Sequence, residues 1–120
     1  MVIPMKPIAL DEKTSRMAQT LSALANPARL EILEILAEEP QSIVADVVRR
    51  LPLAQPTVSQ HLKVLEEAGL IHGERAGAGR CCRIDFGELL GAAEALSRWT
   101  HALAVVSLGN AGRGGATCRP

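Results

Sequence analysis

Residues 55–70, QPTVSQHLKVLEEAGL, carry the clearest structural signal in the sequence. Pro56 suits the first turn of a helix, because its missing N–H would have no partner there. Gly69 is expected to end that helix, since glycine tolerates the positive φ that often follows a helix C-terminus. Between them, apolar residues recur at spacings of three and four, which predicts one apolar stripe along the helix: Val58, Leu62, Leu65 and Ala68.

The opposite face of this helix carries hydrogen-bond donors, and its first two turns contain no acid. Side chains of this kind can contact base edges and phosphates in the major groove of DNA. For His61, which lies among these donors, contact with DNA is favoured over binding of a metal. The pattern therefore predicts a recognition helix whose DNA-contacting residues are Gln55, Thr57, Ser59, Gln60, His61 and Lys63.

The segment before it, which ends in DVVRRLPLA, predicts a supporting helix and a tight turn. The break at residues 51–54 separates the two helices by a short turn, as in a helix-turn-helix. Ala54 and Gln55 are not favoured N-caps, so the second helix lacks a cap that typically adds about 1 kcal/mol. The apolar side of the supporting helix is expected to consist of Val44, Val47, Val48 and Leu51.

The sequence QPTVSQHLKVLEEAGLI resembles the recognition-helix signature of the ArsR/SmtB family of winged-helix repressors. The stretch ALANPARLEILEIL at residues 23–36 and the pair Gly79-Arg80 agree with it, so the resemblance covers about residues 17–86. It implies a winged helix-turn-helix, mostly α with a small β-hairpin, that binds double-stranded operator DNA and is released by an inducer. Because members of this family dimerise through their terminal helices, it also implies a homodimer.

Length and composition fit one small domain. The 13 Lys and Arg residues balance 13 Asp and Glu residues, so DNA binding must come from local placement of cations. No run approaches the roughly 18 consecutive apolar residues of a membrane span. The first residues lack the apolar core and cleavage site of a signal peptide, so we expect a cytoplasmic protein without a membrane partner.

We expect residues 1–9 to form a flexible arm, residues 10–106 the winged helix-turn-helix domain, and residues 107–120 a disordered tail. Within the domain we expect the helix-turn-helix at about 42–69, the wing at about 70–86 and a dimer helix at about 88–106. Asn26 and Pro27 suit the N-cap and first residue of a helix over residues 27–37. The inward residues of that helix are expected to be Leu30, Leu33, Ile35 and Leu36.

The wing is predicted from two short strands joined by AGAG at residues 76–79. Its arginines, Arg75, Arg80 and Arg83, are expected to contact the DNA backbone or minor groove, although a solvated hairpin without such a role is the alternative. Strand alternation directs Cys81 outward beside Arg83. It directs the other face toward the core, namely Cys82, Ile84 and Phe86.

The last predicted helix is long and apolar for the edge of so small a domain. Its apolar residues keep a helical spacing that the small core cannot cover, which predicts burial against a second copy. The predicted dimer interface consists of Leu21, Leu89, Leu96, Trp99 and Leu103.

The inducer is the least determined feature. The family resembled here places metal ligands in a Cys-x-Cys run of the supporting helix or in an Asp-x-His pattern of the last helix, and this sequence matches neither. The remaining candidate ligands are the thiols of Cys81, Cys82 and Cys118, which would suit arsenite, antimonite or another soft metal ion as inducer. Adjacent strand residues point to opposite faces, however, so Cys81 and Cys82 could share an ion only if the strand bent. Cys118 lies beyond the last helix and could join only if the tail folded back.

Several alternatives stay open from the sequence. The cysteines could respond to oxidation or sulfide, or they could sense nothing, with Cys82 as a small buried hydrophobe. The chain could also be a winged-helix interaction module that has lost DNA binding, or a thiol protein that buffers metal. No cofactor is certain. No Ser-His-Asp order, phosphate loop or carboxylate pair stands in a catalytic frame, so we do not expect an enzyme.

Overall fold

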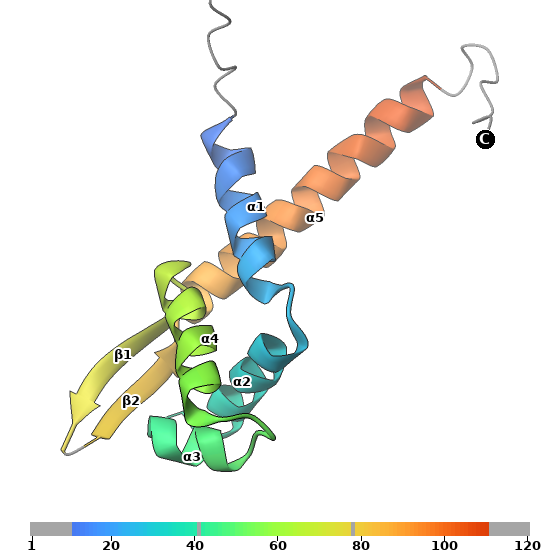
Figure 1. Ribbon diagram of the computed structural model, residues 1–120. Coiled ribbons are helices and arrows are strands. Elements are labelled where there is room, and N and C mark those ends of the chain that lie inside the picture. Colours follow the sequence, from blue (N-terminus) through green and yellow to red (C-terminus); the bar gives the residue numbers. More distant parts are fainter. Residues whose placement is uncertain (1–10, 41, 78, 111–120) are drawn as a thin grey trace, which may run out of the picture.

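The computed structural model describes residues 11–40, 42–77 and 79–110. The expected arm at residues 1–9 and Cys118 lie outside these ranges. Within them, five helices and one two-stranded antiparallel hairpin follow the predicted order (Figure 1). The elements are α1 (Glu12–Leu24), α2 (Pro27–Glu38), α3 (Val44–Arg49), α4 (Gln55–Glu67), β1 (Ile71–Ala76), β2 (Gly79–Ile84) and α5 (Phe86–Gly109).

The predicted helix boundaries rest on recognisable local interactions. The Asn26 side chain caps α2 by accepting hydrogen bonds from the backbone N–H groups of Ala28 (2.9 Å) and Arg29 (3.4 Å). By contrast, Ala54 precedes α4 without a side-chain capping bond, because its methyl group has no hydrogen-bond acceptor. Gly69 follows α4 with a φ of 77°, which confirms the predicted positive-φ position after that helix.

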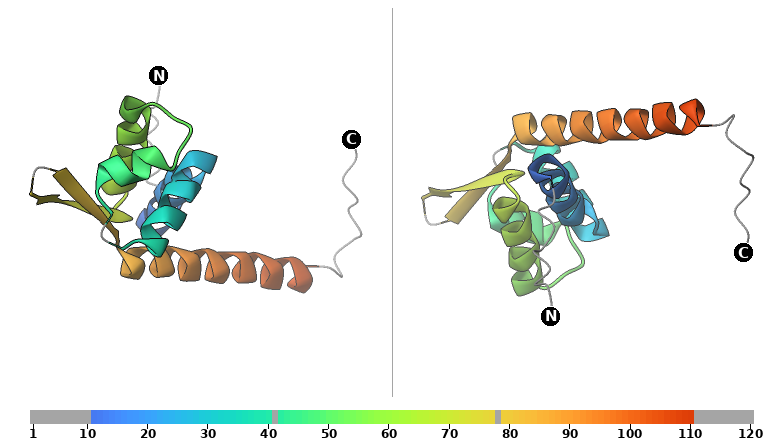
Figure 2. Two further views of the ribbon diagram at one scale, coloured as in Figure 1. Left: turned by 90° about the horizontal axis from the view of Figure 1, so that it is seen from below. Right: turned by 90° about the horizontal axis from the view of Figure 1, so that it is seen from above.

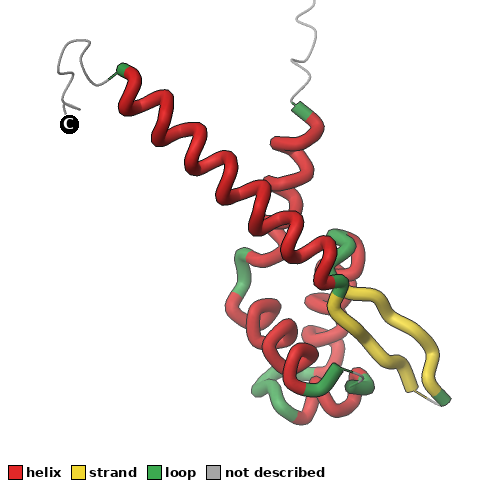
Figure 3. Tube along the Cα trace, turned by 180° about the vertical axis from the view of Figure 1, so that it is seen from behind, coloured by secondary structure: helices red, strands yellow, loops and turns green. Residues whose placement is uncertain are grey.

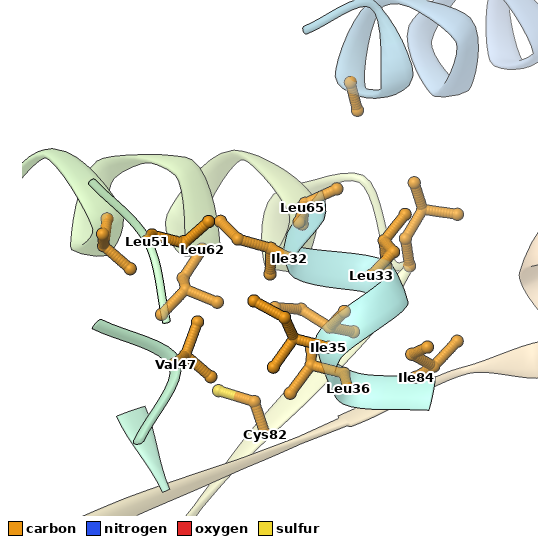
Figure 4. Packing of buried hydrophobic residues seen from close by; sticks show 14 residues of the cluster. Ile32, Leu33, Ile35, Leu36, Val47, Leu51, Leu62, Leu65, Cys82 and Ile84 are labelled. Atoms are coloured by element: carbon orange, nitrogen blue, oxygen red, sulfur yellow. The ribbon is translucent and has the colours of Figure 1, made fainter. Parts of the chain in front are cut away.

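The core lies between α2, α3, α4 and the hairpin (Figure 4). The predicted stripe of α4 is confirmed, because Val58, Leu62 and Leu65 are buried. In α2 the prediction was wrong at one position: Leu30 is 47% exposed, and Ile32 is fully buried. At about 3.6 residues per turn, Leu30 lies on nearly the opposite side of the helix from Ile32, so burial of Ile32 turns Leu30 toward solvent.

Strand β2 is held on both of its edges. On one side it pairs with β1, with Cys82 opposite Gly73 and Cys81 opposite Glu74. On the other side, Ile43 forms an antiparallel bridge with Cys81, and the Cys82 N–H donates to the Ser42 carbonyl at 3.3 Å. The wing is therefore fastened to the segment that leads into α3.

Burial along β2 follows the predicted alternation as far as the strand continues. Cys82 and Ile84 are buried, and Cys81 is half-buried on the other face. Phe86 was wrongly predicted to face the core: it is 55% exposed. The strand ends at Ile84, and Asp85 caps a new helix that begins at Phe86, so strand alternation no longer applies there.

Helix α5 extends away from the rest of the domain (Figure 2). Its first turn lies at the corner where the hairpin joins the domain (Figure 3). It runs from Phe86 to Gly109, beyond both ends of the predicted dimer helix, so residues 107–109 of the expected tail are helical. None of its 24 residues is buried. None of the helices among the described residues combines the length and apolarity needed to cross a bilayer.

Candidate nucleic-acid interface

The recognition helix presents a polar face opposite its buried stripe. Its first turn contains no acid. Ser59 is half-buried, and its hydroxyl accepts a hydrogen bond of 3.2 Å from Nε2 of Gln55, one turn earlier. The exposed side chains of the predicted DNA-contacting set are Gln55, Thr57, Gln60 and Lys63. These groups remain accessible for base edges and phosphates, because α4 packs into the domain only through its other side.

His61 differs from its neighbours on α4. It is half-buried, and its Nδ1 accepts a hydrogen bond of 3.3 Å from Nε of Arg29 on α2. One ring nitrogen of His61 therefore binds within the domain, a contact that the donor pattern of the sequence did not predict. Arg29 carried no signal for this contact, since it lies 32 residues earlier in the chain.

The wing arginines are exposed, but two of them contact acids. Nη2 of Arg80 lies 2.6 Å from Oε1 of Glu66 on α4, and Nε of Arg83 lies 3.6 Å from Oε1 of Glu74 on β1. Arg75 forms no ion pair with any residue that the structure describes. The Arg80–Glu66 pair joins the wing to the recognition helix, and Glu66 is a residue of the site that the sequence did not indicate.

Gly73 makes room for the Arg80–Glu66 pair. A Cβ at Gly73 would lie 2.6 Å from Nε of Arg80, so any larger residue would displace the guanidinium. The same glycine lines a surface hollow of about 630 Å³ together with Arg75, Gly77, Gly79 and Arg80. Two cations around a hollow of small residues allow a polyanionic backbone to approach closely.

Asp85 fastens the base of the wing to the first turn of α5. Its Oδ2 lies 2.8 Å from Nε2 of His72 on β1, and its Oδ1 accepts a 3.0 Å hydrogen bond from the Glu88 N–H. The hydrogen bond with His72, followed by that from Glu88, lowers the pKa of the Asp85 carboxyl. The carboxylate therefore stays ionised at neutral pH, where it also complements the positive end of the α5 dipole.

The thiols are not gathered into a cluster within the described residues. Burial raises the pKa of the Cys82 thiol, which therefore remains protonated inside the core, where Figure 4 shows its sulfur directed toward Val47. Cys81 lies on the opposite face of β2, across from Glu74. No group of three or more His, Cys, Asp and Glu side chains that could hold a metal occurs in residues 11–40, 42–77 and 79–110.

Residues predicted for a dimer interface lie on α1 and α5, which pack against each other. Leu21, Trp99 and Leu103 are 36%, 45% and 52% exposed, and Leu96 is half-buried. Leu89 packs against the core of its own domain. Further exposed apolar residues of α5 lie outside the predicted interface set, including Phe86, Leu90, Val105 and Leu108.

Comparison with known proteins agrees with this architecture. Residues 26–72 match the family model described as "Bacterial regulatory protein, arsR family". The HTH-type transcriptional regulator Rv2034 of Mycobacterium tuberculosis (strain ATCC 25618 / H37Rv) is 43% identical over 82 residues, which are 68% of this chain and 76% of that protein.

Two solved structures share the fold. The ArsR-like transcriptional regulator from Rhodococcus sp. RHA1 has a TM-score of 0.69 at 25% identity, over 82% of this chain and 95% of that one. The homodimeric winged helix-turn-helix DNA-binding domain Mb0332 from Mycobacterium bovis, a possible ArsR-family regulator, has a TM-score of 0.59 at 23% identity, over 97% of this chain and 100% of that one. The chain therefore belongs to the ArsR/SmtB family of winged helix-turn-helix transcriptional regulators, which bind DNA and are not enzymes.

Proposed function

We propose that this protein is a homodimeric repressor that binds operator DNA in the cytoplasm through α4 and the wing and is released by an inducer. The main support for a dimer comes from α5, a largely apolar helix of 24 residues, none of which is buried. An exposed apolar surface of this kind marks an interaction site in a soluble domain. The related Mb0332 domain is homodimeric, which supports a second copy as the occupant.

The second copy would pack against the surface formed by α1 and α5. A groove of about 540 Å³ lies between these helices, and Met17 and Trp99 contribute to its walls. Gly91 and Ala95 also line it, and small residues allow a partner helix to approach closely. The second copy would also cover the exposed side chains of Leu21 and Leu103, so that the groove and these residues form one apolar interface.

Two recognition helices related by a two-fold axis would bind half-sites about one helical turn, or 34–36 Å, apart. Gln60 and Lys63 would contact base edges and phosphates from each α4. Arg75 would contact the backbone directly, whereas Arg80 can do so only by leaving or sharing Glu66. In the same way, Arg83 can contact the backbone only by leaving or sharing Glu74.

A selection experiment tests this function directly. The wild-type chain is used to enrich duplexes from a random-sequence DNA library, and the enriched sequences are then aligned. We expect an inverted repeat with half-site centres about one helical turn apart. Enrichment of no sequence above the starting library would contradict operator recognition, and enrichment of single half-sites would contradict binding as a dimer.

We propose Cys81 as the thiol that responds to the inducer, with arsenite or a related soft ion as its ligand. Cys81 lies on the accessible face of β2, where the strand is fastened to Ile43, so a ligand there would act on both the wing and the helix-turn-helix. Cys82 could join only if the strand distorted. Modification of Cys81 alone is the alternative: peroxide would oxidise the thiol to a sulfenic acid with release of water, or the thiolate would take a sulfane sulfur from a polysulfide with release of hydrosulfide.

Arsenite-dependent release from a selected duplex distinguishes these possibilities. In Cys81→Ser we expect repression-competent binding that no longer responds to arsenite, and in Cys118→Ser a weaker response if three thiolates bind the ion. Release of Cys81→Ser at the wild-type arsenite concentration would rule out the wing as sensor. Release by a polysulfide or peroxide but not by arsenite would favour the alternative.

A further inference from the structure

Arg29 of α2 contacts two other helices at once. It lies near the start of α2, and its Nε donates to Nδ1 of His61 on α4 at 3.3 Å. Its Nη1 donates to the carbonyl oxygens of Ser22 and Ala23 at the end of α1, both at 3.1 Å. One half-buried guanidinium thus joins α1, which lines the groove proposed for the partner, to the helix that carries the DNA-contacting residues.

The contact with α1 has a clear electrostatic basis. The last carbonyl groups of a helix have no partner within the helix and form the negative end of its dipole. The last turn of α1 contains no basic residue of its own. Arg29 supplies the missing charge and the hydrogen bonds from the neighbouring helix.

The contact with α4 determines the tautomer of the His61 ring. Nε of arginine always carries a proton, so Nδ1 of the imidazole must be the acceptor. A neutral ring that accepts at Nδ1 carries its own proton on Nε2. Arg29 therefore selects one tautomer of His61 and fixes the direction in which the ring points from the recognition helix.

We infer that Arg29 is a positioning residue, which couples the α1 side of the proposed dimer to the orientation of the recognition helix. The inference rests on the proposed function and adds the route between its two parts. A shift of α1 relative to α2 would break the bonds to Ser22 and Ala23 or rotate the guanidinium away from His61. The planar guanidinium suits this role, because it directs several donors along separate fixed directions, whereas a lysine ammonium is a compact point charge.

Substitutions at Arg29 and His61 separate positioning from simple stabilisation. Arg29→Lys keeps the charge but cannot reach both acceptor groups in the same geometry. His61→Gln keeps an acceptor and a donor at the end of the side chain, and His61→Leu removes both. Arg49→Lys, the same exchange at an exposed position of α3, is the matched control.

The affinity of full-length variants is measured for a duplex selected by the wild-type chain and for a scrambled duplex. We expect Arg29→Lys and His61→Leu each to weaken specific binding by about tenfold, the effect of losing one hydrogen bond to a charged group. Scrambled DNA should bind as before, the dimer should persist, and Arg49→Lys should stay within about twofold of wild type. His61→Gln should bind more tightly than His61→Leu, because it keeps an acceptor for Arg29. The double variant Arg29→Lys, His61→Leu should be no weaker than either single variant, because both changes remove the same interaction.

Independent effects that multiply to about a hundredfold in the double variant would overturn the inference. So would a His61→Gln protein as impaired as His61→Leu. A second measurement judges the contact without DNA: ¹⁵N chemical shifts of the His61 ring should show the proton on Nε2 in the wild type, with this preference lost in Arg29→Lys. If no duplex is selected but this tautomer is found, the proposed function fails and the contact stands. If the proton lies on Nδ1, the inference fails whatever the DNA result.

Discussion

The winged half of the molecule and helix α5 differ in how their apolar residues are used. In the winged half, Ile32, Val58 and Leu65 have no exposed surface. In α5, Leu90 and Leu108 are 66% and 76% exposed, and no residue is buried. Burial of a large aliphatic side chain stabilises a protein by about 1.5–3 kcal/mol. The winged half therefore obtains its stability from its own contacts, whereas the exposed apolar residues of α5 would become buried only against another molecule.

The largest effect should come from removing the apolar character of α5. Leu96→Glu combined with Leu103→Glu places two charges on the stripe proposed to face the partner, and each lost burial costs about 1.5–3 kcal/mol. We expect monomers that no longer bind operator DNA, as measured by sedimentation and gel shift. Ser97→Glu combined with His101→Glu, on the other side of the helix, is the control and should remain dimeric. A dimeric Leu96→Glu, Leu103→Glu protein would remove this stripe from the interface.

Truncation of the core should have a smaller effect, and on stability alone. Leu65→Ala empties a fully buried position of α4 and should lower the free energy of unfolding by about 2–5 kcal/mol. The comparison variant is Leu90→Ala, at an exposed position of α5, which should change the unfolding free energy of a monomeric background by less than about 0.5 kcal/mol. Urea titrations of both variants in the Leu96→Glu, Leu103→Glu background measure the difference. Equal losses would show that Leu90 is already buried within its own chain.

Within the winged half, the recognition helix and the wing should affect DNA binding differently. Gln60→Ala removes a group proposed to read bases and should weaken specific binding by about 1–3 kcal/mol, with little change on scrambled DNA. Arg75→Ala removes a proposed backbone contact, so it should weaken both duplexes alike and reduce the slope of log K against log salt by about one. Titrations at several salt concentrations measure both quantities. Identical behaviour of the two variants would contradict the division of roles.

The smallest effect is expected at Asp85, where the two regions meet. Its pKa is lowered in the folded protein, so its interactions contribute stability that is fully present above the ordinary carboxyl pKa of about 3.9. That contribution is lost as the pH falls through the lower folded value. We expect Asp85→Asn, which keeps a favourable N-cap, to be slightly less stable than the wild type at pH 7 and to lose this acid-dependent part of the unfolding curve. Thermal unfolding across the acidic range tests this, and an unchanged acid dependence in Asp85→Asn would exclude the carboxylate as its source.

Much of the fold could be predicted because its signals are local. The spacing of Val58, Leu62 and Leu65, the cap at Asn26 and the glycine at position 69 each act over a few residues. The arrangement of the site was less predictable, since Arg29 meets His61 across 32 residues and Arg80 meets Glu66 across 14. Such pairs form only after α2, α4 and the hairpin have packed together.

The errors of prediction have the same origin. Phe86 was assigned to the core by extending strand alternation past the point where Asp85 starts a helix. Apolar identity alone could not decide between Leu30 and Ile32 as the inward residue of α2, because the direction of the core is set by the other helices. Where a choice depends on which elements pack together, a single sequence contains no local signal for it.

Sedimentation equilibrium of the wild-type chain, alone and with a selected duplex, tests the central claim most directly. Each copy has a mass of 12.7 kDa. The account predicts a particle of twice that mass in the absence of DNA, and one such dimer bound to each duplex with two half-sites. A single copy of 12.7 kDa at concentrations where the duplex is fully bound would contradict the claim that α5 is completed by a second copy.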